Sequence, residues 1–205
     1  MQKVALSLLW QDGDQANLDH ARAYAQVVPR VFVIDRRSQG EAYASLADPR
    51  LHYAPFRQNV SLGTALNRAL HLAHEENYSW LWITETRTLI SGEQLLHWSQ
   101  KASSPTRLYR FEDAAETPNL LRRPVCGCLI EVDMARSLGG WDPALPAQLA
   151  LQDFQQRIQS AGVITEKGIQ VQHIGSGLDL APWETVQSLW TLIRRRFLPP
   201  GVKSR

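Results

Sequence analysis

The chain has 205 residues, of which 44% are hydrophobic and 20% charged, a composition typical of one globular domain with a substantial core. Its formal net charge is +2, but five cations follow Glu184, and without them the remainder carries −3. This charge balance excludes the broad basic surface of a nucleic-acid-binding protein. No apolar run reaches the roughly 18–20 residues that span a bilayer.

Neither the N-terminus nor the cysteines indicate export. The first apolar run, residues 4–9, soon meets the polar residues 11–14, which is typical of a buried strand and its loop rather than a signal peptide. Cys126 and Cys128 have no second pair with which to bind zinc. We therefore expect small buried thiols and, by default, a cytoplasmic protein.

The first hundred residues alternate between short apolar runs and segments of helical spacing. Strands are predicted at residues 4–9, 31–35, 51–53 and 80–83, and helices at 17–28, from Leu62 onward and at 92–102. This alternation predicts an α/β fold with a mostly parallel central sheet flanked by helices.

The second half is less regular. Further strands are expected at 108–111, 126–132 and 169–172, and the polar segment 111–124 is expected to be a loop. We predict one domain, residues 1–177, followed by an amphipathic helix and basic tail at 178–205. Two interpretations of that helix remain open: it packs on the domain's own sheet, or it docks on a membrane surface or a protein partner.

Acidic side chains follow the first two predicted strands. Asp12 and Asp14 come after the first, and Asp35 ends the second. Ligands of open α/β sheets bind beyond the carboxyl ends of the strands, where a carboxylate can accept hydrogen bonds from a base or a ribose. The alternative is a turn-forming aspartate without a ligand.

The order of several short motifs over residues 4–176 resembles a family-2 glycosyltransferase of the GT-A fold, in particular its bacterial rhamnosyltransferase-like members. The matching segments are Asp35-Arg36-Arg37-Ser38, Asn59 to Asn67, Gly139-Gly140-Trp141-Asp142, Gln152-Asp153-Phe154, and His173 at a strand end. The resemblance implies one GT-A-like, Rossmann-related domain. It also implies an inverting transfer of a sugar from a nucleotide sugar to a hydroxyl of a glycan or lipid-linked acceptor, as in bacterial surface polysaccharide synthesis.

The resemblance also implies roles for the matching residues. Asp35 and Asn67 would contact the nucleotide sugar, and His173 would lie near its diphosphate. Asp153 would be the general base that takes the acceptor's proton. Structural alternatives remain open for Asp153, as a helix cap, and for His173, as an ordinary strand-end residue.

The loop of Gly140, Trp141 and Asp142 would border the acceptor pocket by the same resemblance. The glycine would allow close approach of the backbone, and the indole could stack on a sugar face. The alternative is a tight turn with Trp141 buried.

One part of the family pattern is altered. Where relatives carry an Asp-x-Asp motif that holds Mg²⁺ or Mn²⁺ against the diphosphate, this chain has Glu85-Thr86-Arg87. Arginine cannot ligate a cation, but it can pair with a diphosphate directly. Three interpretations stay open: a metal-independent transferase that uses Arg87, a weak metal site of Glu85 and His173, or a non-catalytic binding or scaffold protein.

Overall fold

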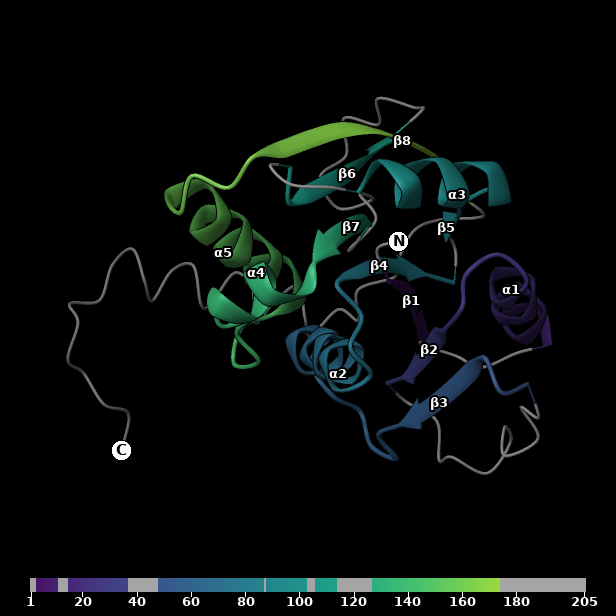
Figure 1. The fold of residues 1–205 in the computed structure, drawn as a ribbon. Helices are drawn as coiled ribbons and strands as arrows, with labels where there is room; N and C mark the ends of the chain where they lie inside the picture. The colour runs from purple at the N-terminus through teal and green to yellow at the C-terminus, as the bar shows by residue number, and fades with distance from the viewer. Residues whose placement is uncertain are drawn as a thin grey trace.

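The computed structural model describes residues 3–10, 15–36, 48–86, 88–102, 106–113 and 127–173. Within these residues the strands form one eight-stranded sheet in the order β3-β2-β1-β4-β7-β6-β8-β5 (Figure 1). Their bounds are β1 Val4–Trp10, β2 Val31–Asp35, β3 Leu51–Pro55, β4 Trp80–Glu85, β5 Thr88–Leu89, β6 Leu108–Asp113, β7 Cys128–Glu131 and β8 Thr165–His173.

Six of these strands run in the same direction. β3, β2, β1 and β4 are parallel neighbours, and β7 lies antiparallel between β4 and β6. β8 is parallel to β6, and the short β5 is antiparallel to β8. The carboxyl ends of β1, β2, β3, β4, β6 and β8 therefore share one edge of the sheet, which confirms the predicted α/β fold.

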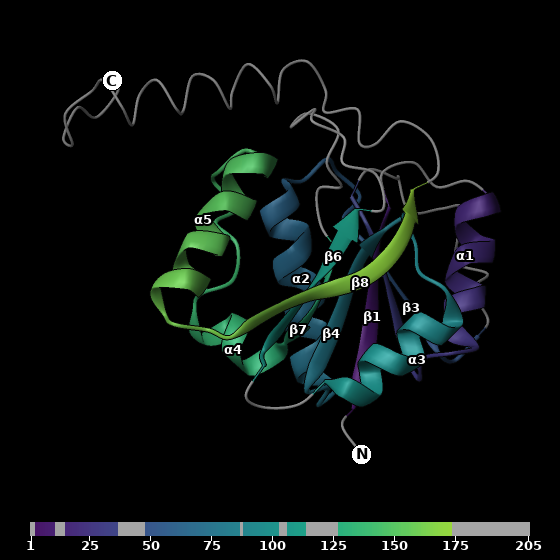
Figure 2. The same ribbon diagram turned by 90° about the horizontal axis from the view of Figure 1, so that it is seen from above.

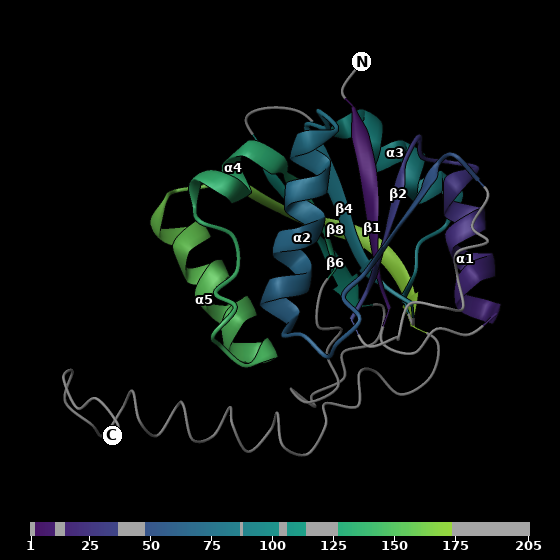
Figure 3. The ribbon, with the colours of Figure 1, turned by 90° about the horizontal axis from the view of Figure 1, so that it is seen from below.

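Helices cover both faces of the sheet. They are α1 Gln15–Ala25, α2 Leu62–Glu75, α3 Gly92–Lys101, α4 Val132–Ser137 and α5 Ala147–Ser160. Figures 2 and 3 show α2, α4 and α5 on one face, and α1 and α3 on the other. The arrangement is a three-layer sandwich with the sheet in the middle.

The central strands are apolar throughout because both of their faces are covered. Every residue of β1 is buried. Ala5 and Leu9 pack in the core beneath α2, whereas Leu6 and Leu8 pack in the core beneath α1 and α3. A continuous apolar run is the expected sequence of such a strand.

The predicted elements are largely confirmed, with corrections to the bounds of several of them in the described residues. α1 occupies 15–25 rather than 17–28, and β6 continues to Asp113 through polar residues that we expected in a loop. The strand predicted at 126–132 ends at Glu131, and α4 begins at the next residue, Val132. The strand predicted at 169–172 begins earlier, at Thr165.

Other predictions lie outside the described residues: the helix and tail of 178–205, Cys126, Asp12 and Asp14. None of the described helices is both long enough and apolar enough to cross a bilayer.

Candidate functional site

Two buried acidic residues flank the carboxyl end of β1. Asp35 of β2 is paired in register with Trp10, and Glu85 of β4 is paired with Leu9. Adjacent strands lie about 4.8 Å apart, so roughly 10 Å separates the backbones of β2 and β4. The chain runs from β1 outward to β2 and β3 and then returns to β4 on the other side of β1. This reversal is the point at which open α/β sheets bind ligands.

The Asp35 carboxylate is held by a tyrosine on the next strand. Asp35 is fully buried, and the Tyr53 hydroxyl donates a hydrogen bond of 2.6 Å to its Oδ2. The Tyr53 ring in turn lies 6.1 Å from the Trp10 ring, centroid to centroid. A short bond from a hydroxyl to a carboxylate oxygen fixes the orientation of the acid.

Arg36 connects this edge to the start of α2. Its buried guanidinium donates from Nε and Nη2 to the Val60 carbonyl, at 3.3 and 3.0 Å, and the Val60 amide donates to the Arg36 carbonyl at 3.4 Å. Ser61 then caps α2 by accepting a hydrogen bond from the Thr64 amide at 3.2 Å. Sequence reasoning did not single out Arg36, because its partner lies 24 residues away.

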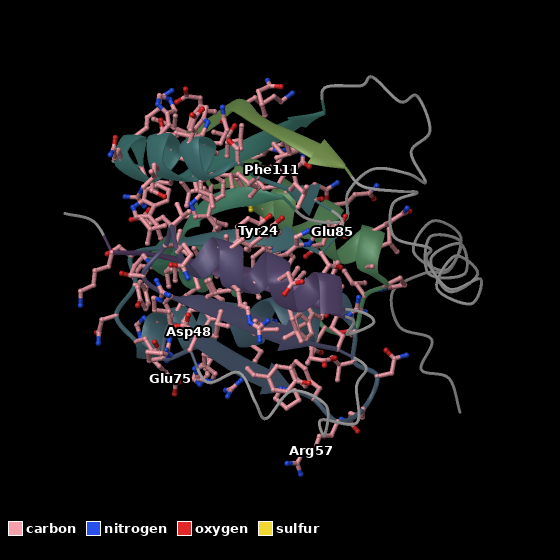
Figure 4. All side chains as sticks on the ribbon, turned by 90° about the vertical axis from the view of Figure 1, so that its right-hand side faces the viewer. Tyr24, Asp48, Arg57, Glu75, Glu85 and Phe111 are labelled. Carbon is pink, nitrogen blue, oxygen red and sulfur yellow. The ribbon has the colours of Figure 1, made fainter. Side chains whose placement is uncertain are left out.

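Glu85 belongs to a tight turn between β4 and β5, and is labelled in Figure 4. Only 5% of Glu85 is exposed, and its Oε1 accepts a hydrogen bond of 3.5 Å from Thr88 Oγ1. The Thr84 hydroxyl donates to the Thr88 carbonyl at 3.4 Å. Thr88 also pairs with His173 across β5 and β8. The structure thus brings the backbone of His173 beside the turn that carries Glu85.

The described residues do not by themselves form a metal site at this turn. Arg87 and the His173 side chain lie outside the described part. Because threonines occupy positions 84 and 86, Glu85 is the one carboxylate of residues 84–86. Mg²⁺ requires a full octahedron of oxygen ligands, which one carboxylate does not supply. In the described ranges no three His, Cys, Asp or Glu side chains gather as metal ligands would.

A second cluster forms where α2 and α5 meet residues 139–142, the loop after α4 that we call the glycine loop. The Asn67 Nδ2 donates to the Trp141 carbonyl at 2.7 Å, and the Trp141 amide donates to Asn67 Oδ1 at 2.9 Å. Asn67, predicted at the nucleotide sugar, thus has its amide occupied in holding the loop. Gly140 has φ +64°, and a Cβ there would lie 2.3 Å from Asn67 Oδ1. The glycine is required by both conformation and space.

Trp141 lies in the core, as in the buried-turn alternative. Its exposed fraction is 3%, and its ring lies 4.3 Å from the Phe154 ring, centroid to centroid. The indole therefore offers no surface on which a sugar could stack. Asp142 is half-buried, and its Oδ1 accepts a hydrogen bond of 2.9 Å from the Ala144 amide, which turns the chain toward α5.

Asp153 lies in the second turn of α5, which begins at Ala147. The cap interpretation is therefore wrong. Arg157 donates from Nε and Nη2 to Asp153 Oδ2, at 3.0 and 2.8 Å. The same guanidinium donates to the carbonyls of Leu138 and, at 2.7 Å, of Gly140. Arg157 thus ties Asp153 to the glycine loop, and its spacing of four residues from Asp153 was the signal available in the sequence.

The two clusters adjoin through the first turn of α2. Val60 contacts Arg36 on the sheet-edge side. On the other side, a Cβ at Gly63 would lie 2.7 Å from the Asp142 carbonyl oxygen, so α2 and the glycine loop pack backbone to backbone. The first turn of α2 therefore lies between the buried acids Asp35 and Glu85 on one side and the glycine loop with Asp153 on the other.

Comparison with known proteins identifies the fold. No protein-family model matches the chain, and no curated protein matches it. Among solved structures, a Pyrobaculum calidifontis mannosyltransferase in complex with GDP-Man and Mn²⁺ is similar with a TM-score of 0.67 and 14% identity, covering 99% of this chain and 66% of the other.

Two further transferase structures are similar. A Mycobacterium tuberculosis glucosyl-3-phosphoglycerate synthase in complex with Mn²⁺, UDP and phosphoglyceric acid has a TM-score of 0.60 at 14% identity over 97% of this chain and 80% of the other. S. aureus TarS in complex with UDP-GlcNAc has a TM-score of 0.61 at 10% identity over 85% of this chain and 60% of the other. This chain therefore has the fold of the GT-A glycosyltransferases and spans about two thirds of the mannosyltransferase.

Proposed function

We propose that the chain is an atypical inverting glycosyltransferase, which binds a nucleotide sugar at the carboxyl edge of β2, β1 and β4. The observation that carries this proposal is the placement of Asp35 and Glu85 on either side of the end of β1, where the strand order reverses. The similar structures add support, because they are complexes with GDP-Man, UDP and UDP-GlcNAc.

On the donor side, Asp35 receives the base or ribose, and Glu85, Arg87 and His173 face the diphosphate. Arg87 supplies the positive charge that the altered motif otherwise lacks, since a guanidinium can donate two parallel hydrogen bonds to phosphate oxygens. No step of the proposed reaction runs through a metal ion. Asn67 acts on the loop rather than on the nucleotide, because both polar atoms of its amide bind Trp141.

On the acceptor side, Asp153 is the proposed general base, and Gly140 and Asp142 border the acceptor. As the acceptor hydroxyl oxygen bonds to the anomeric carbon, the bond from that carbon to the diphosphate oxygen breaks, and the hydroxyl proton passes to Asp153. The bonds from Arg157 both end on Asp153 Oδ2, which keeps the carboxylate oriented relative to the glycine loop.

A glycan or lipid-linked acceptor in bacterial surface polysaccharide synthesis is the substrate class we propose. A cytoplasmic protein that is peripheral on the inner face of the membrane, through the helix predicted in residues 178–205, would fit a lipid-linked acceptor.

A non-catalytic binding or scaffold protein is the second candidate. The observation in its favour is that Arg157, which binds Asp153, also donates to the carbonyls of Leu138 and Gly140. These contacts are the ones that a purely structural role of Asp153 requires. The two candidates differ in donor turnover: the enzyme consumes a nucleotide sugar in the presence of an acceptor, and the binding protein does not.

Equilibrium dialysis against labelled UDP-, GDP- and dTDP-sugars tests the donor site. We expect one donor to bind, and Asp35→Asn to weaken that binding about tenfold or more, since a charge-assisted hydrogen bond is lost. Asp48→Asn is the matched control, because Asp48 precedes β3 at the opposite edge of the sheet (Figure 4). If no donor binds to the unchanged protein, the proposal is wrong.

Donor consumption tests the base. Asp153→Asn should reduce transfer about 10²–10⁴-fold, as general-base removal does, with donor binding unchanged. Asp133→Asn, an exposed change on α4, should leave transfer unaffected. Equal transfer by the Asp153→Asn variant and the unchanged protein would remove Asp153 from the mechanism.

A further inference from the structure

A buried tyrosine of α1 reaches the turn that carries Glu85. Tyr24 is 5% exposed, and its hydroxyl donates to the Thr88 carbonyl at 3.1 Å and accepts from the Ile90 amide at 3.2 Å. These two groups lie two residues apart on the segment that leaves the turn. The phenol thus bridges the backbone on both sides of Leu89, 64 and 66 residues away in the chain.

The bonded segment is coupled to the donor side of the proposed site at two points. The Thr88 side chain donates to Glu85 Oε1, and the Thr88 backbone pairs with His173 of β8. The Thr88 carbonyl also receives the Thr84 hydroxyl. A displacement of Thr88 would therefore move both Glu85 and the end of β8.

We infer that Tyr24 is a positioning residue for the diphosphate side of the nucleotide site: its hydroxyl fixes Thr88 and Ile90, and through them Glu85 and the backbone of His173. The inference rests on the proposed function, since it assigns the diphosphate to the β4–β5 turn. It adds a residue of α1 that touches none of the expected substrate groups and matches no motif in the sequence.

The protonation state of Tyr24 suits this role. Burial raises the pKa of its phenol and outweighs the opposite effect of the Ile90 amide, so the hydroxyl keeps its proton at neutral pH. A neutral hydroxyl can donate to Thr88 and accept from Ile90 at the same time. Phenylalanine keeps the ring in the core beneath α1 but leaves the Ile90 amide without this acceptor.

A second buried tyrosine provides a matched control. Tyr109 of β6 is 2% exposed, and its hydroxyl donates to the Lys101 carbonyl at 3.0 Å. Its ring lies 5.3 Å from that of Trp98, on the α3 side of the sheet. Tyr109→Phe therefore also removes one buried hydroxyl that is bonded to the backbone, but away from the β4–β5 turn.

Amide hydrogen exchange on the full chain tests the positioning itself. In Tyr24→Phe we expect exchange at the Ile90 amide to be about tenfold faster, the factor for one lost hydrogen bond, with little change in β6 and α3. Tyr109→Phe should leave exchange at Ile90 unchanged. An unchanged Ile90 amide in Tyr24→Phe would overturn the inference, whether or not the protein binds nucleotides.

Affinities for nucleotides test the link to the diphosphate. UDP, GDP and dTDP are each titrated beside the corresponding monophosphate, so that the ratio of the two affinities isolates the second phosphate. Tyr24→Phe should lower this ratio about fivefold to tenfold, and Tyr109→Phe should leave it unchanged. An equal ratio in all three proteins would limit Tyr24 to a structural role and overturn the inference. Absence of any nucleotide binding by the unchanged protein would instead contradict the proposed function.

Discussion

The side-chain amide of Asn67 forms two hydrogen bonds with the backbone of Trp141, one to its carbonyl and one from its amide. The two residues are 74 positions apart in the chain. Since Asn67 belongs to α2 and Trp141 follows the two glycines of the loop, this pair fixes the glycine loop to the helix that begins beside the sheet edge. The positions of the loop and of the proposed nucleotide site are therefore linked.

Asn67→Ala should destabilise the protein by about 1–3 kcal/mol, because it leaves both the carbonyl and the amide of a buried residue without their partners. Urea denaturation measures the change in the free energy of unfolding. Arg68→Ala, at the next and exposed position of α2, is the control and should cost much less. Equal losses in the two variants would show that the two hydrogen bonds between Asn67 and Trp141 do not stabilise the fold.

Gly140→Ala should cost more than Gly162→Ala. Both glycines have φ +64°, so both alanines meet the same left-handed strain, about 1–2 kcal/mol. Only the Cβ at position 140 also meets Asn67 Oδ1, at 2.3 Å, whereas the Cβ at 162 would have nothing within 4 Å. We expect overpacking to add about 1–3 kcal/mol at position 140.

The double variant Gly140→Ala with Asn67→Ala provides a check on this reading. Asn67→Ala removes the atom that the new Cβ meets. The double variant should therefore lose less free energy of unfolding than the sum of the losses in the two single variants. Strict additivity in urea denaturation would contradict a direct clash between the two residues.

Protonation of the Glu76 carboxylate should lower the free energy of unfolding at acid pH. Burial opposes ionisation of this carboxyl, but Arg30 and His52 donate to it and hold its pKa below the ordinary 4.5. A depressed folded-state pKa stabilises the protein above pH 4.5, and this contribution is lost as the pH falls below 4.5 through the folded pKa.

Glu76→Gln should therefore lower the free energy of unfolding at pH 7 and flatten its decline between pH 7 and pH 3. Glu75→Gln, which removes an exposed carboxyl that faces His71, should retain the decline. Denaturant unfolding at several pH values gives both curves, and parallel curves for Glu76→Gln and the unchanged protein would contradict the assignment.

Cys128 should react slowly with alkylating reagents in the folded protein. The residue is half-buried rather than fully buried, but desolvation of its thiol raises the pKa to about 12, against the smaller opposing effect of Arg110. At pH 8 such a thiol is ionised to about 1 part in 10⁴, compared with roughly a quarter for an ordinary thiol of pKa about 8.5.

A Cys126→Ser background leaves Cys128 as the single thiol for this measurement. Iodoacetamide should modify it about 10³-fold more slowly in buffer at pH 8 than in unfolding concentrations of urea, following the thiolate fraction. Equal rates in the two conditions would show that the thiol is not shielded.

The sequence predicts the sheet well because each central strand is buried on both faces and therefore continuously apolar. The ends of β2, β4 and β8 place Asp35, Glu85 and the backbone of His173 at one edge, as the resemblance implied. The two-residue strand β5 is too short for any periodic signal. α4 was missed because its first residue continues the apolar run of β7.

Contacts between distant residues could not be predicted. The burial of Trp141 depends on its packing against Phe154, and the occupation of the Asn67 amide depends on a loop 74 residues away. Arg36 and Tyr24 escaped notice for the same reason, since neither residue type nor spacing indicates their partners. The Asp153–Arg157 pair, in contrast, had a local signal, its spacing of four on one helix.

Calorimetric titration of UDP, GDP and dTDP, in EDTA and again in Mn²⁺, tests the central claim most directly. We predict that at least one of these nucleotides binds in EDTA, and that Arg87→Ala abolishes the binding by removing the cation that we propose for the diphosphate. Failure of all three nucleotides to bind in either condition would contradict a nucleotide-sugar site at the carboxyl edge of β2, β1 and β4.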